Sequence, residues 1–188
     1  MKDKQKTTEK QAFNLKQELF EWIKIIIIAA VIAFVLNRFI IANSYVPSPS
    51  METTIMTGDR IIGSRLSYAF GSDPGRGDIV IFDHKVEPGK DQTRLVKRVV
   101  GLSGETVDIR DGHVYINQSD IPLGEPYLPE DMESGTFHFE IPEGCYLMLG
   151  DNRNHSTDAR FWPDPYVPED AIIAKVLLRY YPGIKKIQ

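Results

Sequence analysis

Hydrophobic residues near the N-terminus form one long run over residues 22–42. Its strongly polar members, Lys24, Asn37 and Arg38, all lie near its ends. At about 1.5 Å per residue, a helix over this run extends roughly 31 Å, close to the roughly 30 Å thickness of the hydrocarbon core of a bilayer. Basic side chains at the ends of such a helix can reach the lipid headgroups. The pattern therefore predicts one transmembrane helix.

A cleaved secretory signal is the alternative interpretation, because the uninterrupted apolar stretch over residues 25–36 is short enough for one. Two features favour a retained anchor: the polar leader over residues 1–21 is long, and Ile40 with Ala42 makes a poor small-x-small cleavage site. The leader is also rich in lysine, which is typical of cytoplasmic flanks. We therefore expect a cytoplasmic tail, a single-pass anchor and an extracytoplasmic catalytic domain over residues 43–188.

Beyond the anchor, short apolar runs and alternation with a period of two residues are typical of β-strands. We expect strands over residues 78–82, 94–102, 105–109, 113–116, 145–149 and 172–181. Asp111-Gly112 lies between two of these runs and favours a type I′ turn, hence a hairpin. The 12 prolines and 14 glycines leave little room for long helices. The sequence thus predicts a mainly β domain, built as a coiled antiparallel sheet or barrel-like.

Two polar segments interrupt the strand pattern. Residues 117–136 are rich in Pro, Gly, Asp and Glu, and we expect an exposed loop that carries no chemistry. Residues 150–160 form a dense polar loop directly after the strand expected over residues 145–149, a place where functional side chains often lie. The alternative for this second loop is a surface turn held by local hydrogen bonds of Asp and Asn.

Composition narrows the classes of protein to consider. The chain has 188 residues, enough for one domain with a real core, and a formal net charge of -4. No basic cluster lies beyond the N-terminal leader, which argues against nucleic acid as a partner. Cys145 is the single cysteine, so neither an internal disulfide nor a multi-cysteine zinc site can form.

Two serines, Ser48 and Ser50, stand in a proline-stiffened stretch just after the anchor. Proline restricts the backbone to extended conformations and would hold both hydroxyls in fixed positions. A polyproline-like linker between membrane and domain is the alternative. A base near one of these serines is needed to distinguish a nucleophile from a linker.

Lys97 is the lysine best placed to act as that base. A lysine can accept a proton only when neutral, which requires an apolar site that lowers its pKa. A strand over this segment puts Lys97 on the face of Leu95 and Val99, whereas Lys85 and Lys90 lie in a loop rich in Pro, Gly and acids. The alternative is an edge-strand lysine that blocks aggregation.

Taken in order, these segments resemble bacterial type I signal peptidases of the short, single-anchor form. The resemblance rests on Ser-Pro-Ser-Met after the span, on residues 76–80, on residues 97–101, and on residues 150–160. It extends from the anchor to Tyr180-Tyr181-Pro182 and is specific in order and spacing. It implies a membrane-bound serine endopeptidase with a coiled β-sheet and with no metal or organic cofactor.

The resemblance also implies a role for each site residue. Ser50 would be the nucleophile, and Lys97 the general base that later protonates the leaving amine. Ser48 matches the hydroxyl that completes the oxyanion hole with the backbone N–H of Ser50, and Ser156 matches the hydroxyl that orients the lysine. The charged residues that would buttress the site are Arg98, Asp151, Arg153, Asp158 and Arg160. Of these, Arg98 with Asp151 and Asp158 with Arg160 are the expected ion pairs.

Secretory preproteins would be the substrates, cut after a small-x-small motif while their chain lies extended beside residues 43–51 and 92–97. The sequence departs from the family pattern at Asn154, where an aspartate is frequent, at Ala159, where a serine is frequent, and over residues 163–165, where a glycine is usual. These departures leave substrate preference and efficiency open. The sequence also leaves the oligomeric state open.

Three rival functions compete with this interpretation. A sortase-like transpeptidase would use Cys145, but the strand pattern there favours a small core residue. A Ser50–His155–Asp158 triad is the second, although His155 has the polar neighbours of an ordinary solvated histidine. The third is a membrane-tethered β domain that binds a partner without catalysis. Trp162 and its aromatic neighbours could rest on the lipid interface, but core packing is the favoured role.

Overall fold

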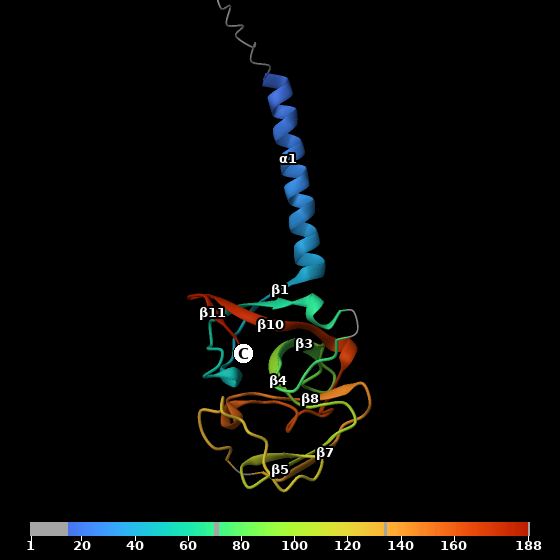
Figure 1. Ribbon diagram of the computed structural model, residues 1–188, viewed down its shortest axis with the longest axis vertical. Coiled ribbons are helices and arrows are strands. Elements are labelled where there is room, and N and C mark those ends of the chain that lie inside the picture. The colour runs from blue at the N-terminus through green and yellow to red at the C-terminus, as the bar shows by residue number, and fades with distance from the viewer. Residues whose placement is uncertain (1–14, 70–71, 134, 188) are drawn as a thin grey trace, which may run out of the picture. The chain divides into compact units, whose positions relative to one another are not determined.

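The computed structural model describes residues 15–69, 72–133 and 135–187 (Figure 1). The first element is the helix α1, Leu15–Val35, which continues as a π-helical turn over Leu36–Ile40. By length and composition, the 25 residues Lys16–Ile40 could cross a bilayer, so the single apolar helix predicted at the N-terminus is present. Most of the lysine-rich leader, residues 1–14, lies outside the described residues.

The helix begins earlier and ends earlier than the apolar run suggests. Its described part starts at Leu15, whereas Ile41 and Ala42 already belong to strand β1, Ile41–Tyr45. In that strand Ala42 lies opposite Gly63 and is buried. An apolar residue satisfies a sheet core as well as a bilayer, so hydropathy alone does not mark this boundary.

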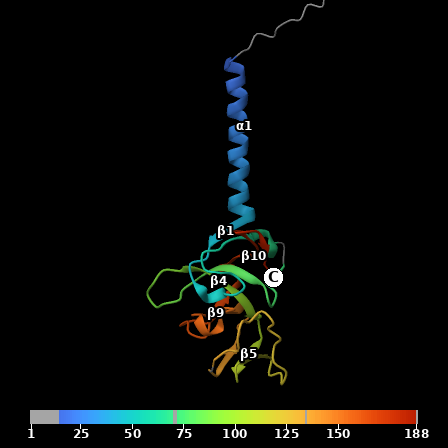
Figure 2. The ribbon, with the colours of Figure 1, turned by 90° about the vertical axis from the view of Figure 1, so that its left-hand side faces the viewer.

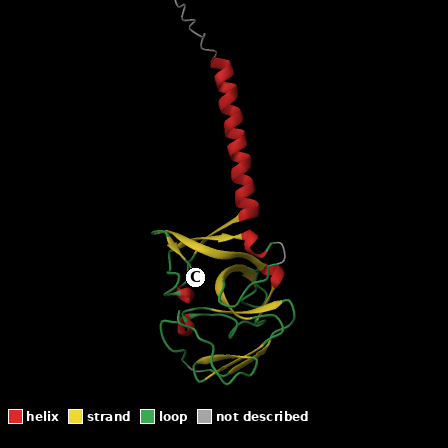
Figure 3. Cartoon of the chain, in the orientation of Figure 1, coloured by secondary structure: helices red, strands yellow, loops and turns green. Residues whose placement is uncertain are grey.

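The described strands form two antiparallel sheets (Figure 3). The larger has the order β1-β2-β10-β3-β4-β8-β9, with β11 paired to β10, and the smaller has the order β6-β5-β7. The strands of the larger sheet after β1 are β2 Arg60–Ser64, β3 Ile79–His84, β4 Thr93–Gly101, β8 Cys145–Leu149, β9 Tyr166–Pro168, β10 Ile172–Tyr181 and β11 Lys185–Lys186. The smaller sheet contains β5 Thr106–Arg110, β6 His113–Ile116 and β7 Phe137–Glu140. Figure 2 shows the smaller sheet at the end of the β domain opposite β1 and β10.

The sheet prediction is confirmed for the antiparallel arrangement, and the strand order shows no closed barrel. Among the described strands the larger sheet is an open path that ends at β1 and β9. Register shifts interrupt the ladders of β10 with β2 and β3 and the ladder of β4 with β8, and such bulges increase local twist. Added twist of this kind allows a long sheet to coil without closing.

The six expected strands are all present, within two residues of their predicted ends. The hairpin is confirmed as well: φ is 50° at Asp111 and 78° at Gly112, as a type I′ turn requires. Sequence patterning missed β1, β2, β7, β9 and β11, which have two to five residues each. Strands this short offer too few alternations for a period to stand out.

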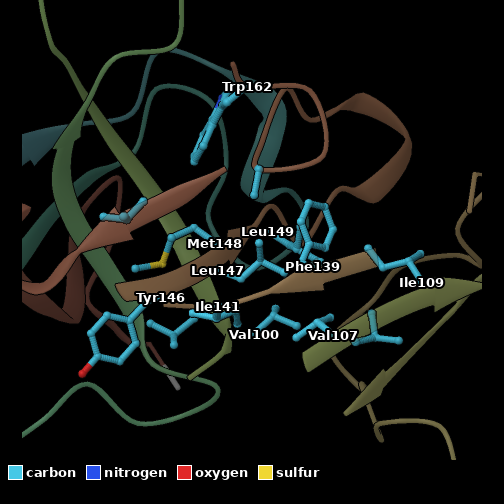
Figure 4. Close-up of a cluster of buried hydrophobic side chains, with 14 of the residues drawn as sticks. Val100, Val107, Ile109, Phe139, Ile141, Tyr146, Leu147, Met148, Leu149 and Trp162 are labelled. Atoms are coloured by element: carbon cyan, nitrogen blue, oxygen red, sulfur yellow. The ribbon is translucent and has the colours of Figure 1, made fainter. Parts of the chain in front are cut away.

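Two hydrophobic clusters fill the domain. The first joins β4 and β8 to the smaller sheet through side chains such as Val100, Val107 and Leu147 (Figure 4). Trp162 belongs to it, at 6.1 Å from the Phe82 ring and 4.7 Å from the His84 ring, so core packing rather than lipid contact is its role.

The second cluster surrounds the chain just after the two candidate serines. Met51 and Ile55 are fully buried there, together with Ala42 and Val46 on the preceding side. Burying one such side chain contributes about 1.5–3 kcal/mol. Core residues therefore anchor the serine segment on both sides, and this segment is part of the domain rather than a linker.

We predict that Met51→Ala lowers the free energy of unfolding by about 2–5 kcal/mol, because it leaves a cavity beside Ser50. Denaturant unfolding monitored by fluorescence measures this loss. Met56→Ala, at a side chain that is 41% exposed, is the matched control and should change stability little. Equal losses in both variants would show that Met51 does not anchor the segment.

Candidate active site

Ser48 and Ser50 stand at the junction between extended chain and a single helical turn. Ser48 is extended, with φ -128° and ψ 155°, but Pro49–Met51 form one turn of 3-10 helix. The extended stretch expected to hold both serines therefore ends at Ser48 and does not include Ser50. Proline at the first helical position explains this, since its fixed φ suits a helix start. The turn brings the Oγ atoms of Ser48 and Ser50 to 3.4 Å from each other.

Lys97 lies in the middle of β4, opposite Val80 of β3, and is only 2% exposed. Its Nζ donates a hydrogen bond of 3.0 Å to Ser156 Oγ. Burial lowers the pKa of Lys97 from its ordinary value of 10.5 to about 8, although the carboxylates of Asp158 and Asp151 act in the opposite direction. At neutral pH roughly a tenth of the molecules therefore carry a neutral amine at this position.

Ser50 and Lys97 line one cavity of about 230 Å³. Its walls come from the two segments expected to flank a substrate, and they comprise Ser44, Tyr45, Val46, Pro47, Ser48, Ser50, Met51, Thr93, Arg94, Leu95, Val96 and Lys97. The structure thus brings a buried amine and a serine hydroxyl, 47 positions apart in the sequence, to the wall of the same cavity.

Both walls of this cavity carry strand edges that face no other described strand. β1 pairs with β2 on one side, and it ends the strand order of the larger sheet. β4 pairs with β3 over Thr93–Arg98, whereas β8 pairs with it only from Arg98 onward. An unpaired edge offers backbone N–H and C=O groups to an added extended peptide. The cavity is therefore suited to a peptide in strand conformation.

The loop after β8 forms hydrogen bonds to the backbone carbonyls of the serine turn. The backbone N–H of Asn152 donates to Ser50 O at 3.1 Å, and its Nδ2 donates to Pro49 O at 3.0 Å. Gly150 makes the closest approach: a Cβ on it would lie 2.2 Å from Ser156 Oγ and 2.4 Å from Ser50 O. Only glycine fits between the serine turn and the partner of the lysine.

Both expected ion pairs are present and buried. Arg98 binds Asp151 through two hydrogen bonds of 2.8 and 2.7 Å, a bidentate geometry. Arg160 Nε donates to Asp158 Oδ1 at 2.8 Å, and Asp158 Oδ2 accepts the backbone N–H of Gly150 at 3.0 Å. The Arg98–Asp151 pair connects β4 to the loop that carries Gly150, and Asp158 joins Gly150 to Arg160 within that loop, so the loop has a fixed position relative to Lys97.

Three contributors to this network were missed. Thr54 Oγ1 donates to Asp151 Oδ2 at 2.6 Å. Glu125 pairs with Arg153 at 2.5 Å, and the ring of Tyr127 lies 3.8 Å from the Arg98 guanidinium carbon. The expectation that residues 117–136 carry only an exposed loop is therefore wrong for Glu125 and Tyr127, which reach the buried charges of the site.

Charge counting is the signal that could have found Glu125. Three arginines were assigned to the site, but only two carboxylates. A buried guanidinium stays charged and needs an acidic partner, so a third carboxylate had to come from elsewhere in the chain.

Two departures from the family pattern have local explanations. Asn154 Nδ2 donates to Glu130 Oε1 at 2.8 Å and to Asp131 O at 3.1 Å, while its Oδ1 accepts the backbone N–H of Glu133. An ionised aspartate could not make the two donor contacts. Ala159 is buried within the first hydrophobic cluster, where a serine hydroxyl would need a partner.

The rival nucleophile and base are poorly placed. Cys145 lies at the start of β8, and burial together with Asp164 and Asp170 raises the pKa of its thiol, the opposite of activation. His155 is exposed, and within the described residues it makes no hydrogen bond to Ser50 or Asp158.

Known proteins define the class to which this arrangement belongs. Residues 19–181 match the model of the family described as "Signal peptidase, peptidase S26", and the chain belongs to this family. A signal peptidase I of Leptolyngbya laminosa is 40% identical over 87% of this chain and 80% of its own length. A signal peptidase I of Bacillus licheniformis is 36% identical, covering 81% and 84%. A crystal structure of a signal peptidase I from Enterococcus faecalis is 33% identical, covers 55% of this chain and 97% of its own, and superposes with a TM-score of 0.45.

We predict that Gly150→Ala reduces peptide cleavage by at least about a hundredfold, because its Cβ must displace Ser156 or the Ser50 carbonyl. Steady-state kinetics with a signal-peptide substrate measures the loss. The matched control is Gly183→Ala, where a Cβ would meet nothing within 4 Å. A Gly150→Ala enzyme with full activity would show that this close approach is dispensable.

Proposed function

We propose that this chain is a membrane-anchored serine endopeptidase that removes signal peptides from preproteins, with Ser50 as nucleophile and Lys97 as general base. The observation that carries the proposal is the cavity lined by both residues, in which burial lowers the pKa of the lysine to about 8. Burying a charged lysine this deeply costs free energy, and the cost is smaller when the amine is neutral. Membership of the signal peptidase family gives the substrate class.

Catalysis would proceed in two acyl-transfer steps. Lys97 Nζ takes the Ser50 hydroxyl proton as Oγ bonds to the scissile carbonyl carbon, and the resulting ammonium then protonates the leaving amine as the C–N bond breaks. A water molecule, deprotonated by Lys97, next attacks the acyl carbon, and the Lys97 ammonium returns this proton to Ser50 Oγ as the acyl C–Oγ bond breaks. The Ser48 hydroxyl and the Ser50 backbone N–H would stabilise the oxyanion, and Ser156 would hold the Lys97 amine in place.

The strand edges at the cavity support the specificity of the family. A peptide added as a strand presents alternate side chains to the same side, so its first and third residues before the cut face one wall. A small-x-small motif places its two small residues at these positions. With a cavity of about 230 Å³, side chains of modest size fit.

We propose that the tail precedes a single membrane span with its N-terminus in the cytoplasm, and that residues 43–188 act on the other side. The apolar helix over Lys16–Ile40 supports the anchor. The lysine-rich leader supports the orientation, since basic residues remain on the cytoplasmic side.

We predict that Ser50→Ala and Lys97→Ala each lower cleavage of a purified preprotein by at least about a thousandfold, since residues that act as a unit fail together. Gel analysis of the processed product, over a time course in detergent, measures this. Lys85→Ala, at an exposed lysine, is the control and should retain full activity. Substantial cleavage by either site variant would refute the dyad, and a non-catalytic domain would show no cleavage even in the wild type.

We also predict a rising pH profile. The base must be neutral, and below its pKa of about 8 Lys97 is protonated, so kcat/KM should rise about tenfold per pH unit up to about pH 8 and then level off. Initial rates across pH 5.5–10 measure the profile. An acidic limb centred near 6.5, the ordinary value for histidine, would instead favour the His155 triad.

A further inference from the structure

Glu125 and Tyr127 approach the site from outside, on a loop that lines no part of the cavity at Ser50. The Glu125 side chain is 6% exposed, and its two oxygens accept from Arg153 Nη2 at 2.5 Å and Nη1 at 3.0 Å. The Tyr127 hydroxyl donates a hydrogen bond of 2.7 Å to Glu125 Oε1, and the Tyr127 ring covers the Arg98 guanidinium. Two buried arginines thus have contacts with this one loop.

Arg153 connects Glu125 to Gly150, the glycine beside Ser50 and Ser156. Its Nε donates to Gly150 O at 3.0 Å, and Arg160 Nη2 donates to Arg153 O at 2.6 Å. Gly150 in turn lies against Ser156 Oγ and Ser50 O. A displacement of Arg153 would therefore move the glycine that separates the nucleophile from the partner of the lysine.

No other carboxylate around Arg153 in the described part of the chain is free to balance its charge in place of Glu125. Burial opposes the charge of Arg153, but Glu125, with smaller contributions from Tyr127 and Asp158, raises its pKa overall. Asp158 already binds Arg160 and the Gly150 N–H. Without Glu125, Arg153 would be a buried cation competing for the carboxylate that Arg160 uses.

We propose that Glu125 and Tyr127 are positioning residues of the cleavage reaction, which hold Arg153 on Gly150 and Arg98 on Asp151 and thereby keep Ser50, Ser156 and Lys97 aligned. This inference rests on the proposed function. Neither residue lines the cavity, so they act on turnover and not on substrate binding. The path to the chemistry is short: Glu125 binds Arg153, Arg153 binds Gly150 O, and Gly150 lies against Ser50 O.

The first test is Glu125→Gln, which keeps the shape of the side chain and removes its charge. In the full-length enzyme we expect kcat to fall roughly tenfold to a hundredfold, the size of effect that small misplacements of reacting groups cause, with KM within about twofold of wild type. Glu130→Gln is the matched control, because Glu130 is an exposed carboxylate of the same loop whose hydrogen bond within the described residues goes to Asn154. It should leave both constants unchanged.

The pH profile separates positioning from simple loop stability. Lys97 faces the charges of Asp158, Arg160 and Asp151. In Glu125→Gln the uncompensated Arg153 adds positive charge to this set, so the midpoint of the acidic limb should shift to lower pH. If the loop merely loosened and admitted water to Lys97, the midpoint of the acidic limb would shift to higher pH, towards the ordinary pKa of lysine.

Tyr127 provides a second, milder variant in case Glu125→Gln does not fold. Tyr127→Phe removes only the hydroxyl contact to Glu125 and should lower kcat several-fold, whereas Tyr127→Leu also uncovers Arg98 and should lower it further. Thermal unfolding of each variant verifies that the protein is folded.

The results are decisive in either direction. A fall in kcat at constant KM with a downward midpoint shift supports the proposal. Wild-type kcat in folded Glu125→Gln or Tyr127→Leu overturns it, as does an upward shift or a loss confined to KM. Failure of the proposed function would appear differently, as cleavage by Ser50→Ala or Lys97→Ala.

Discussion

Keeping an amine neutral inside a protein is the constraint on which the site depends. Lys97 is 2% exposed, and desolvation is the largest influence on its pKa. Asp158 and Asp151 would restore the charge if their own charges were unopposed. Each instead binds an arginine, Asp151 to Arg98 and Asp158 to Arg160, so the negative charge near the amine is largely compensated. The ion pairs thus protect the chemistry of Lys97 as well as holding the loop.

The positions of the site residues are fixed by the hydrophobic core, by contacts of the loop after β8 and by the arginine network. The 3-10 turn that carries Ser50 is anchored in the hydrophobic core by Met51, and Asn152 donates hydrogen bonds to its backbone carbonyls. Ser156 meets Lys97 because Gly150 allows the loop to pass close to the serine turn. The arginine network links these pieces across β4, β8 and the loop at Glu125. A single arrangement therefore aligns the hydroxyl, the amine and the edges that would receive a peptide.

How far the sequence predicts this structure depends on how local each feature is. The apolar helix, the longer strands and the Asp111-Gly112 hairpin follow from patterns within a few residues, and all are confirmed. The burial of Lys97 follows from its apolar neighbours in β4, and the roles given to Ser48, Ser50 and Ser156 came from family resemblance. Residue pairs remote in sequence were the difficulty. Thr54 with Asp151 and Glu125 with Arg153 are separated by 97 and 28 positions, and no local pattern connects them.

The central claim is that burial lowers the pKa of Lys97 far enough for roughly a tenth of the folded molecules to carry a neutral amine near neutral pH. Its most direct test is an NMR titration of the lysine side chains, with the Lys97 signal assigned from its absence in a Lys97→Arg variant. The titration is best done in the Ser50→Ala protein in detergent micelles, because this variant lacks the proposed nucleophile. The account predicts that the Lys97 signal titrates near pH 8, below the ordinary lysine value of 10.5. Titration of Lys97 together with the exposed lysines would contradict it.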